Sequence, residues 1–202
     1  MEAFDSIEWA RAAKRKRDFA GAEEILKNAL AVAEEPEVRE ELLRQLFYLY
    51  FSPVYENLVE AEHCLAEIDK LNPSSHNGME WALFLLNCKK DSAGAKKWAE
   101  ITMERAESEN VISVLYTATA FAGLLAAKES NVQKVRSALQ KLTSLVESGQ
   151  DLPWGDEVIF LEASVAISEE TRRDVKALAT QITPRIENPE YQQRAERLTR
   201  VD

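Results

Sequence analysis

The stretch that decides the fold is DFAGAEEILKNALAVA, residues 18–33. Its apolar side chains recur at i, i+3, i+4, i+7, i+8 and i+11, at Ala22, Ile25, Leu26, Ala29, Leu30 and Ala33. This spacing puts them on one face of a helix with 3.6 residues per turn. The pattern returns at residues 58–71 and 132–146, and no comparable run alternates with period two. The sequence therefore predicts an all-α protein.

The start of this stretch is repeated later in the chain, because DFAGAEE at residues 18–24 returns as DSAGAKK at residues 91–97. Expected second helices of successive pairs align on a small or β-branched residue, at Ala22, Ala61, Ala95, Val135 and Val175. One helix pair cannot cover its own apolar face, so neighbouring pairs must stack. Helices are expected at residues 2–16, 18–34, 37–51, 54–71, 76–89, 92–107, 110–128, 131–147, 154–167, 169–183 and 189–200. They group into pairs 2–36, 37–74, 75–109, 110–150 and 152–187 with a cap at 188–202, in a single domain 1–202.

Several helix starts have recognisable caps. Asp18 and Asp91 can accept hydrogen bonds from the first free amides of a helix. Ser52-Pro53 and Asn188-Pro189 fit an N-cap followed by proline at the first helical position.

The charge balance disfavours two classes of partner. The chain has 25 Lys and Arg against 35 Asp and Glu, a net charge of −10. Binding to nucleic acid or to an anionic membrane needs the opposite sign. Residues 21–70 alone carry −8. A solvated helix surface is the first interpretation of this acidity, and a patch that meets a basic partner is the second.

Cysteine usage and the chain start bear on location. Two cysteines, Cys64 and Cys88, make no disulfide framework and favour a reducing compartment. Neither a secretory signal pattern nor an uncharged apolar run long enough to span a bilayer is found. We therefore expect a cytoplasmic protein.

Catalytic and metal-binding patterns are absent from the sequence. Glu62, His63 and Cys64 have the right residue types for a metal site, but consecutive helical residues point about 100° apart. His76 and Glu80 share a helix face and supply only two ligands. Glycine-rich phosphate loops are also missing. We expect no enzyme activity, no metal and no cofactor.

The chain resembles the tetratricopeptide repeat (TPR) family, most clearly over residues 3–107. That family's second helix carries a small residue, an apolar residue four later and a small residue three after that. The matching residues here are Ala22, Leu26 and Ala29, then Ala61, Leu65, Ile68 and Pro73, then Ala95, Ala99 and Thr102. Trp9-Ala10 and the turn Arg17-Asp18-Phe19 also fit. Because Ala22 and Ala61 are 39 residues apart and the family's repeat has 34, we place the extra residues of this repeat at Ser52–Asn57, where Pro53 would break a helix.

The resemblance implies a right-handed α-α superhelix, a TPR-like solenoid of about five helix pairs plus a C-terminal capping helix. It also implies a concave groove, lined by first helices, that binds a peptide or helix of a protein partner. Carried over position by position, the groove residues are Arg11, Lys14, Gln45, Tyr48, Asn77, Glu80, Phe84 and Asn87. The expected function is a non-catalytic interaction adaptor.

Other functions are also compatible with a stack of helix pairs. The protein could be a self-associating solenoid, such as a homodimer, or a regulatory subunit of a larger complex. An all-α enzyme is the least favoured. The basic run from Arg11 to Arg17 fits cations at a helix C-terminus better than a nucleic-acid patch. The apolar run Leu46–Phe51 fits buried core first and an exposed aromatic groove second.

Overall fold

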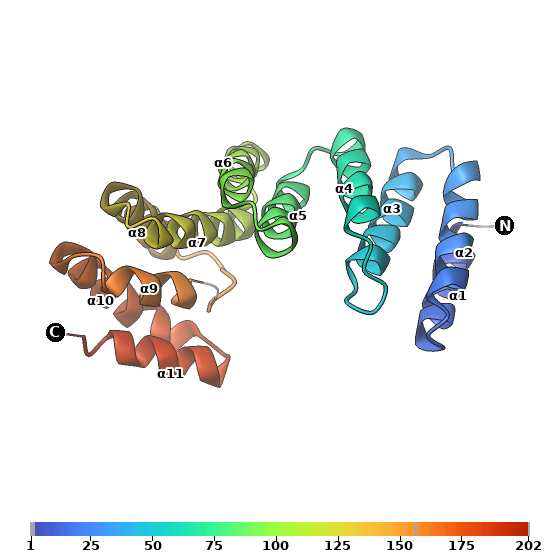
Figure 1. Ribbon diagram of the computed structural model, residues 1–202. Coiled ribbons are helices and arrows are strands. Elements are labelled where there is room, and N and C mark those ends of the chain that lie inside the picture. The colour runs from blue at the N-terminus through green and yellow to red at the C-terminus, as the bar shows by residue number, and fades with distance from the viewer. Residues whose placement is uncertain (1–2, 156, 202) are drawn as a thin grey trace. The chain divides into compact units, whose positions relative to one another are not determined.

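The computed structural model describes residues 3–155 and 157–201, and the regular structure within them is helical throughout (Figure 1). The predicted all-α class is confirmed. The helices are α1 Ala3–Arg15, α2 Phe19–Val32, α3 Pro36–Phe51, α4 Leu58–Leu71, α5 Ser75–Phe84, α6 Ser92–Glu109, α7 Ile112–Lys128, α8 Val132–Glu147, α9 Val158–Val165, α10 Glu169–Ile182 and α11 Pro189–Leu198. A π-helical turn, Leu85–Lys89, follows α5, and a 3-10 turn, Thr183–Arg185, follows α10.

The chain forms two compact units, Met1–Glu80 and Trp81–Asp202, and the boundary between them falls within α5. The first unit holds α1 to α4 and the start of α5. The second holds the end of α5 and α6 to α11. The expectation of one domain over residues 1–202 stays a prediction.

In the first unit, the repeated sequence motif builds a helix start and a close helix contact. The Asp18 side chain accepts a hydrogen bond from the Gly21 amide at 2.9 Å. Ala22 and Ala61, the small residues that head α2 and α4, are fully buried, as are Leu26 and Leu65. The predicted apolar face of α2 therefore contributes Ala22 and Leu26 to the core, while its other four residues, Ile25, Ala29, Leu30 and Ala33, are half-buried.

The loop Ser52–Asn57 differs from the expectation that a helix starts at residue 54. Asn57, not Ser52, caps α4, because its side chain accepts from the Glu60 amide at 3.3 Å. Tyr55 anchors the loop, since its ring stacks on Phe19 and its hydroxyl donates to Glu23 at 2.5 Å. The extra residues expected at Ser52–Asn57 are found there, outside any helix.

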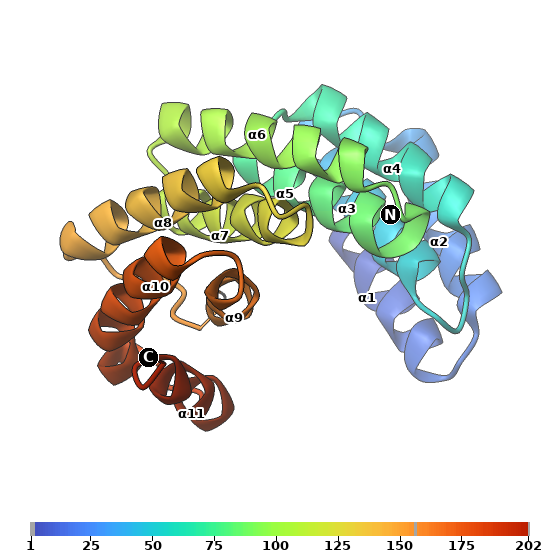
Figure 2. The ribbon, with the colours of Figure 1, turned by 60° about the vertical axis from the view of Figure 1, so that its left-hand side comes forward.

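In the second unit, α6, α7 and α8 lie side by side, and α9, α10 and α11 gather at the C-terminal end (Figure 2). The core includes Tyr116, Leu139, Leu142, Phe160, Leu161 and Val175, all at most 1% exposed. Gly123 on α7 permits a close approach, because a Cβ there would lie 2.6 Å from the Phe160 ring. The helix expected at 154–167 is shorter, and α9 begins only at Val158.

Candidate binding surfaces

A polar cluster centred on Arg44 joins α3 to the start of α5 in the first unit. Arg44 donates to Glu40 at 2.8 Å, to Glu80 at 2.8 Å and to the Asn77 side-chain oxygen at 2.8 Å. The Tyr48 hydroxyl donates to Glu80 at 2.5 Å. One guanidinium thus fixes two carboxylates and an amide, as its planar fork of donors allows.

The charge of Arg44 in this cluster is compensated by the carboxylates of Glu40 and Glu80, which contact it directly. Burial alone would lower the pKa of the Arg44 guanidinium, but Glu80 and Glu40 together raise it above its usual value. Burial raises the pKa of the Tyr48 hydroxyl, and the hydrogen bond to Glu80 raises it further. Arg44 therefore stays a cation and Tyr48 a neutral donor, which keeps the cluster fixed at physiological pH.

Beside this cluster, three side chains on α3 form what we call the α3 surface: Gln45, Tyr48 and Phe51. Tyr48 is 44% and Phe51 38% exposed, although both are large rings. Buried Phe47 supports them, with ring centroids 5.2 Å from Tyr48 and 5.5 Å from Phe51. The Gln45 amide donates to Glu41 at 2.8 Å, which orients its carbonyl. The α3 surface is thus aromatic, partly exposed and held in place.

Of the eight residues predicted for the groove, the structure brings three together, namely Tyr48, Asn77 and Glu80, through Arg44. Gln45 lies one turn from Tyr48 on the same helix. Asn77 itself is fully buried and donates to the Asn72 carbonyl at 2.6 Å. It positions the cluster rather than facing solvent.

The other four predicted residues lie elsewhere. Arg11 is exposed on α1 and pairs with Glu8 at 2.7 Å, and Lys14 is half-buried in the same helix. Asn87 lies in the π-helical turn, where its carbonyl accepts from Lys90. Phe84 is only 1% exposed and packs edge-on against Trp81, so the expectation that it lines a surface is corrected here.

Sequence reasoning missed Arg44 and Glu40, which hold the cluster together. The signal was present, because Glu40 and Arg44 stand at i and i+4 on a helix, the spacing of a stabilising ion pair. The groove residues were chosen by their positions in the family's repeat. That choice takes no account of ion pairs between residues of one helix.

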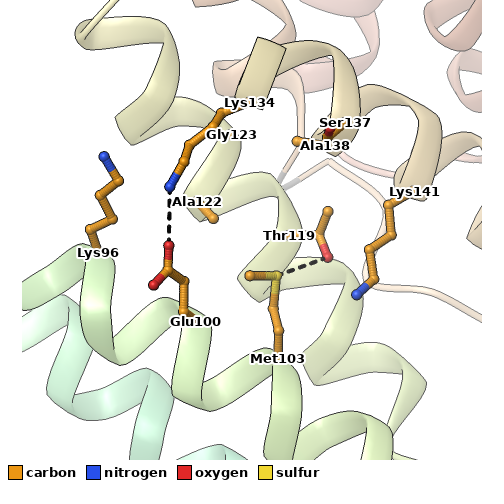
Figure 3. A pocket seen from close by; sticks show the side chains of 10 residues that line it. All are labelled: Lys96, Glu100, Met103, Thr119, Ala122, Gly123, Lys134, Ser137, Ala138 and Lys141. Carbon is orange, nitrogen blue, oxygen red and sulfur yellow. Dashed lines mark hydrogen bonds and ion pairs between the residues drawn. The ribbon is translucent and has the colours of Figure 1, made fainter. Parts of the chain in front are cut away.

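A second feature is a pocket of about 210 Å³ in the second unit, between α6, α7 and α8 (Figure 3). Its apolar lining is made of small or flexible residues, including Met103, Ala122 and Ala138. Three lysines stand around it: Lys96, Lys134 and Lys141. Lys134 points toward Glu100 (Figure 3), and the two side chains form an ion pair at 3.2 Å. Lys96 pairs with Glu129 and Lys141 with Glu107.

A third feature is a pocket of about 300 Å³ in the first unit, between α2, α3 and α4. Leu43 and Leu46 lie on its floor, and Glu60 and Glu67 stand on its α4 side. Cys64 also lines it, and burial, followed by the nearby Glu60, raises the pKa of its thiol to about 12. This thiol is therefore not a nucleophile at physiological pH.

Within residues 3–155 and 157–201, no three His, Cys, Asp or Glu side chains come together as metal ligands would. None of the helices described there is both long and apolar enough to cross a membrane.

Comparison with known proteins identifies the fold. No protein-family model matches the chain, and no curated protein matches it either. Among the solved structures that are similar to it, two match over 96% of its length. One is PilW, a widely conserved type IV pilus biogenesis factor, with a TM-score of 0.52, 15% identity and 90% of that chain covered. The other is a putative kinesin light chain of Podosopora anserina with nearly identical TPR-like repeats, with a TM-score of 0.57, 11% identity and 93% covered.

At these identities the likeness concerns the fold. The chain has a TPR-like α-solenoid fold, and the resemblance expected from Ala22, Ala61 and Ala95 is confirmed over nearly the whole chain.

Proposed function

We propose that this protein is a non-catalytic interaction scaffold that binds a peptide segment of a partner protein on the α3 surface. The observation that carries the proposal is the Arg44 cluster, which fixes the half-exposed Tyr48 ring through Glu80. Exposed, preordered aromatic side chains lose little conformational freedom on binding, and such residues dominate binding energy at interfaces. The TPR-like fold supports the same class of function.

The chemistry of the α3 surface indicates how a peptide would bind. Tyr48 and Phe51 stand one helical turn apart and offer ring faces to an apolar or proline side chain. The Gln45 amide offers hydrogen bonds to a peptide backbone. Because the surrounding residues 21–70 carry −8, a peptide with flanking basic residues is favoured over an acidic one.

The test places a photo-crosslinking amino acid at position 48 of the full chain and irradiates it in a lysate of its source cells. Affinity capture is run in parallel with wild type, with a double variant Gln45→Ala and Tyr48→Ala, and with a control, Val59→Ala and Lys70→Ala. Val59 and Lys70 are exposed on α4 and do not belong to the α3 surface. Circular dichroism and melting must first show that both variants fold.

We expect one partner that crosslinks at position 48 and whose recovery falls at least about tenfold in the α3 variant but not in the control. Equal recovery with both variants would contradict the α3 surface as the site. If no partner is found, sedimentation tests the open alternative of self-association, and a concentration-dependent dimer would replace the adaptor proposal.

A further inference from the structure

The first helix, α1, exposes a large aromatic side chain. Trp9 fits the large apolar position of the repeat pattern, and yet it is 53% exposed. In Figure 1, α1 and α2 lie at one edge of the first unit, beside α3. Among the described residues, α1 packs mainly against α2, which leaves the Trp9 ring uncovered. Tryptophan is enriched at protein interfaces, where it contributes strongly to binding.

Trp9 belongs to a stripe of four side chains along α1. Asp5, Trp9, Ala12 and Lys16 follow one another at spacings of four, three and four residues, which places them on one face of the helix. Asp5 and Lys16 are exposed like Trp9, and Ala12 is half-buried. Lys16 continues the helical path, because its amide donates to the Ala12 carbonyl at 3.3 Å. We call these four residues the α1 stripe.

The charges at the two ends of the α1 stripe are available to a partner. Asp5 and Lys16 are eleven residues apart, about 16 Å along the helix, so they cannot pair with each other. Within residues 3–155 and 157–201, neither side chain has an ion-pair partner. The neighbouring Glu8 and Arg11, by contrast, pair with each other at 2.7 Å. The α1 stripe therefore offers one unpaired anion and one unpaired cation.

The order of the α1 stripe is complementary to its own reverse. From the N-terminus it presents an acid, a large aromatic ring, a small residue and a base. Two copies of α1 that pack antiparallel about a two-fold axis place Asp5 opposite Lys16 and Trp9 opposite Ala12. The small Ala12 side chain leaves room for the ring at the usual interaxial distance of about 8–10 Å. Opposite charges that face each other fix the register of such an interface.

We propose that this protein forms a symmetric homodimer through the α1 stripe. A second copy is the occupant because it supplies the matching residue for each of the four positions. A partner of a single charge sign would leave one end of the stripe unpaired. A tryptophan buries at most about 250 Å², so an interface centred on two of them is smaller than the standard of about 1,600 Å². We therefore expect a weak dimer, with a dissociation constant between about 10 and 500 μM.

Sedimentation equilibrium of the full chain between about 5 and 500 μM measures the dimer. The average mass of wild type should rise over this range from that of one chain toward that of two. Trp9→Ala should weaken dimerisation at least about tenfold, because it removes both aromatic contacts. The control Val59→Ala changes an exposed valine on α4 outside the stripe and should stay within about twofold of wild type. A wild type that stays monomeric at the highest concentration would overturn the proposal.

Reversing one charge of the α1 stripe tests the antiparallel order. In a dimer of Asp5→Lys, two lysines face each other at both ends, and in a dimer of Lys16→Asp, two aspartates do. Each variant alone should dimerise at least about tenfold more weakly than wild type. An equal mixture of the two variants should associate again, because a mixed dimer has opposite charges at both ends. Lys97→Asp, an exposed change on α6, is the control and should dimerise as wild type does.

Circular dichroism confirms that each variant folds before it is measured. If the mixture associates no better than either charge variant alone, the two stripes do not pair and the proposal is wrong. A dimer that neither Trp9→Ala nor the charge variants weaken uses another surface, which also contradicts it.

The α1 stripe and the α3 surface are on different helices, so the two proposals can be separated. The double variant Gln45→Ala and Tyr48→Ala should dimerise as wild type does. A dimer together with a captured partner supports both proposals, and a dimer without a captured partner supports this one alone.

Discussion

At the scale of single residues, Glu23 on α2 joins three parts of the first unit. Its carboxylate accepts hydrogen bonds from Tyr50 at 2.8 Å and from the loop residue Tyr55 at 2.5 Å, and it pairs with Lys27 at 2.6 Å. Burial by itself would raise the pKa of this carboxyl, but the hydrogen bonds outweigh burial and lower the pKa to about 2. The ionised form of Glu23 therefore stabilises the fold.

We expect Glu23→Gln to lower the free energy of unfolding by about 1–3 kcal/mol at pH 7, because a charged acceptor is lost from three hydrogen bonds. The pKa in the folded state lies below the ordinary value of 4.5, so this stabilisation is complete above about pH 4.5. It is lost as the pH falls from there toward about 2. Urea unfolding of wild type and variant at pH 7 and at pH 3 measures the difference, which should shrink at pH 3.

The neighbouring Glu24 is exposed and provides the matched control. Glu24→Gln should change stability by less than about 0.5 kcal/mol at both pH values. An equal loss from the two substitutions would mean that general charge, not the Glu23 contacts, is responsible.

At the scale of elements, the repeated Asp-x-x-Gly motif combines two features of a helix start. The aspartate caps the helix, and the glycine three residues later leaves space for the aspartate carboxylate. The Asp91 side chain accepts from the Gly94 amide at 2.9 Å at the start of α6. A Cβ at Gly94 would overlap the Asp91 carboxylate. Asp18 and Gly21 share this arrangement in α2. The glycine is therefore required by the cap rather than by the helix.

Asp91→Ala should cost about 1 kcal/mol of stability, the usual value of an N-cap, and Asp91→Asn should cost little because asparagine also caps. Gly94→Ala in the Asp91→Ala background should recover up to about 1 kcal/mol, since alanine favours helix and the overlap with the carboxylate is gone, which leaves the Leu85 methyl carbon at 3.1 Å as the close contact. In wild type the same change should gain less. Thermal and urea unfolding of the four proteins measures this coupling, and strictly additive effects would contradict it.

Element boundaries show what sequence can and cannot predict. Periodicity and caps placed most helices within a few residues, as at α2 and α6, because the signals lie within one helix. The start of α4 was wrong because Ser52-Pro53 looks like a cap, while Tyr55 takes the loop to Phe19 and Glu23 on another element. Such a contact is invisible to local patterns.

The binding surfaces also show the difference between signals within one helix, which the sequence reveals, and contacts between elements, which it does not. Tyr48 and Glu80 were named from a family pattern, but their direct hydrogen bond joins two helices, and Arg44, on the same helix as Tyr48, holds the Glu80 carboxylate. Phe84 was misplaced because the end of α5 packs it against Trp81 in the core. The pocket between α6, α7 and α8 needs three helices, and lysine spacing on one of them does not reveal it.

At the scale of the whole molecule, the two compact units make stability local. In a stack of repeats, each helix pair interacts mainly with its neighbours, so a defect spreads over a limited distance. Leu26 in the first unit and Leu139 in the second are both 1% exposed and provide a matched pair of core positions. Replacing either with alanine should cost about 2–5 kcal/mol.

We expect Leu26→Ala to speed amide hydrogen exchange mainly in α1 to α4, and Leu139→Ala mainly in α7 to α10. Exchange followed by mass spectrometry on the full chain measures both. If each variant speeds exchange equally along the entire chain, the protein unfolds as one cooperative body and the two-unit description does not extend to its energetics.

The π-helical turn Leu85–Lys89 has a consequence for the alignment of this chain with other repeat proteins. Its hydrogen bonds join residues five apart instead of four, so the turn takes up an additional residue without interrupting the helical path. Ala61 and Ala95, the small residues that head α4 and α6 on either side of this turn, are nevertheless 34 residues apart, the family's own repeat length. The additional residue is therefore taken up within the repeat, and an alignment needs no gap after the turn. It does need one at Ser52–Asn57, because Ala22 and Ala61 are 39 residues apart.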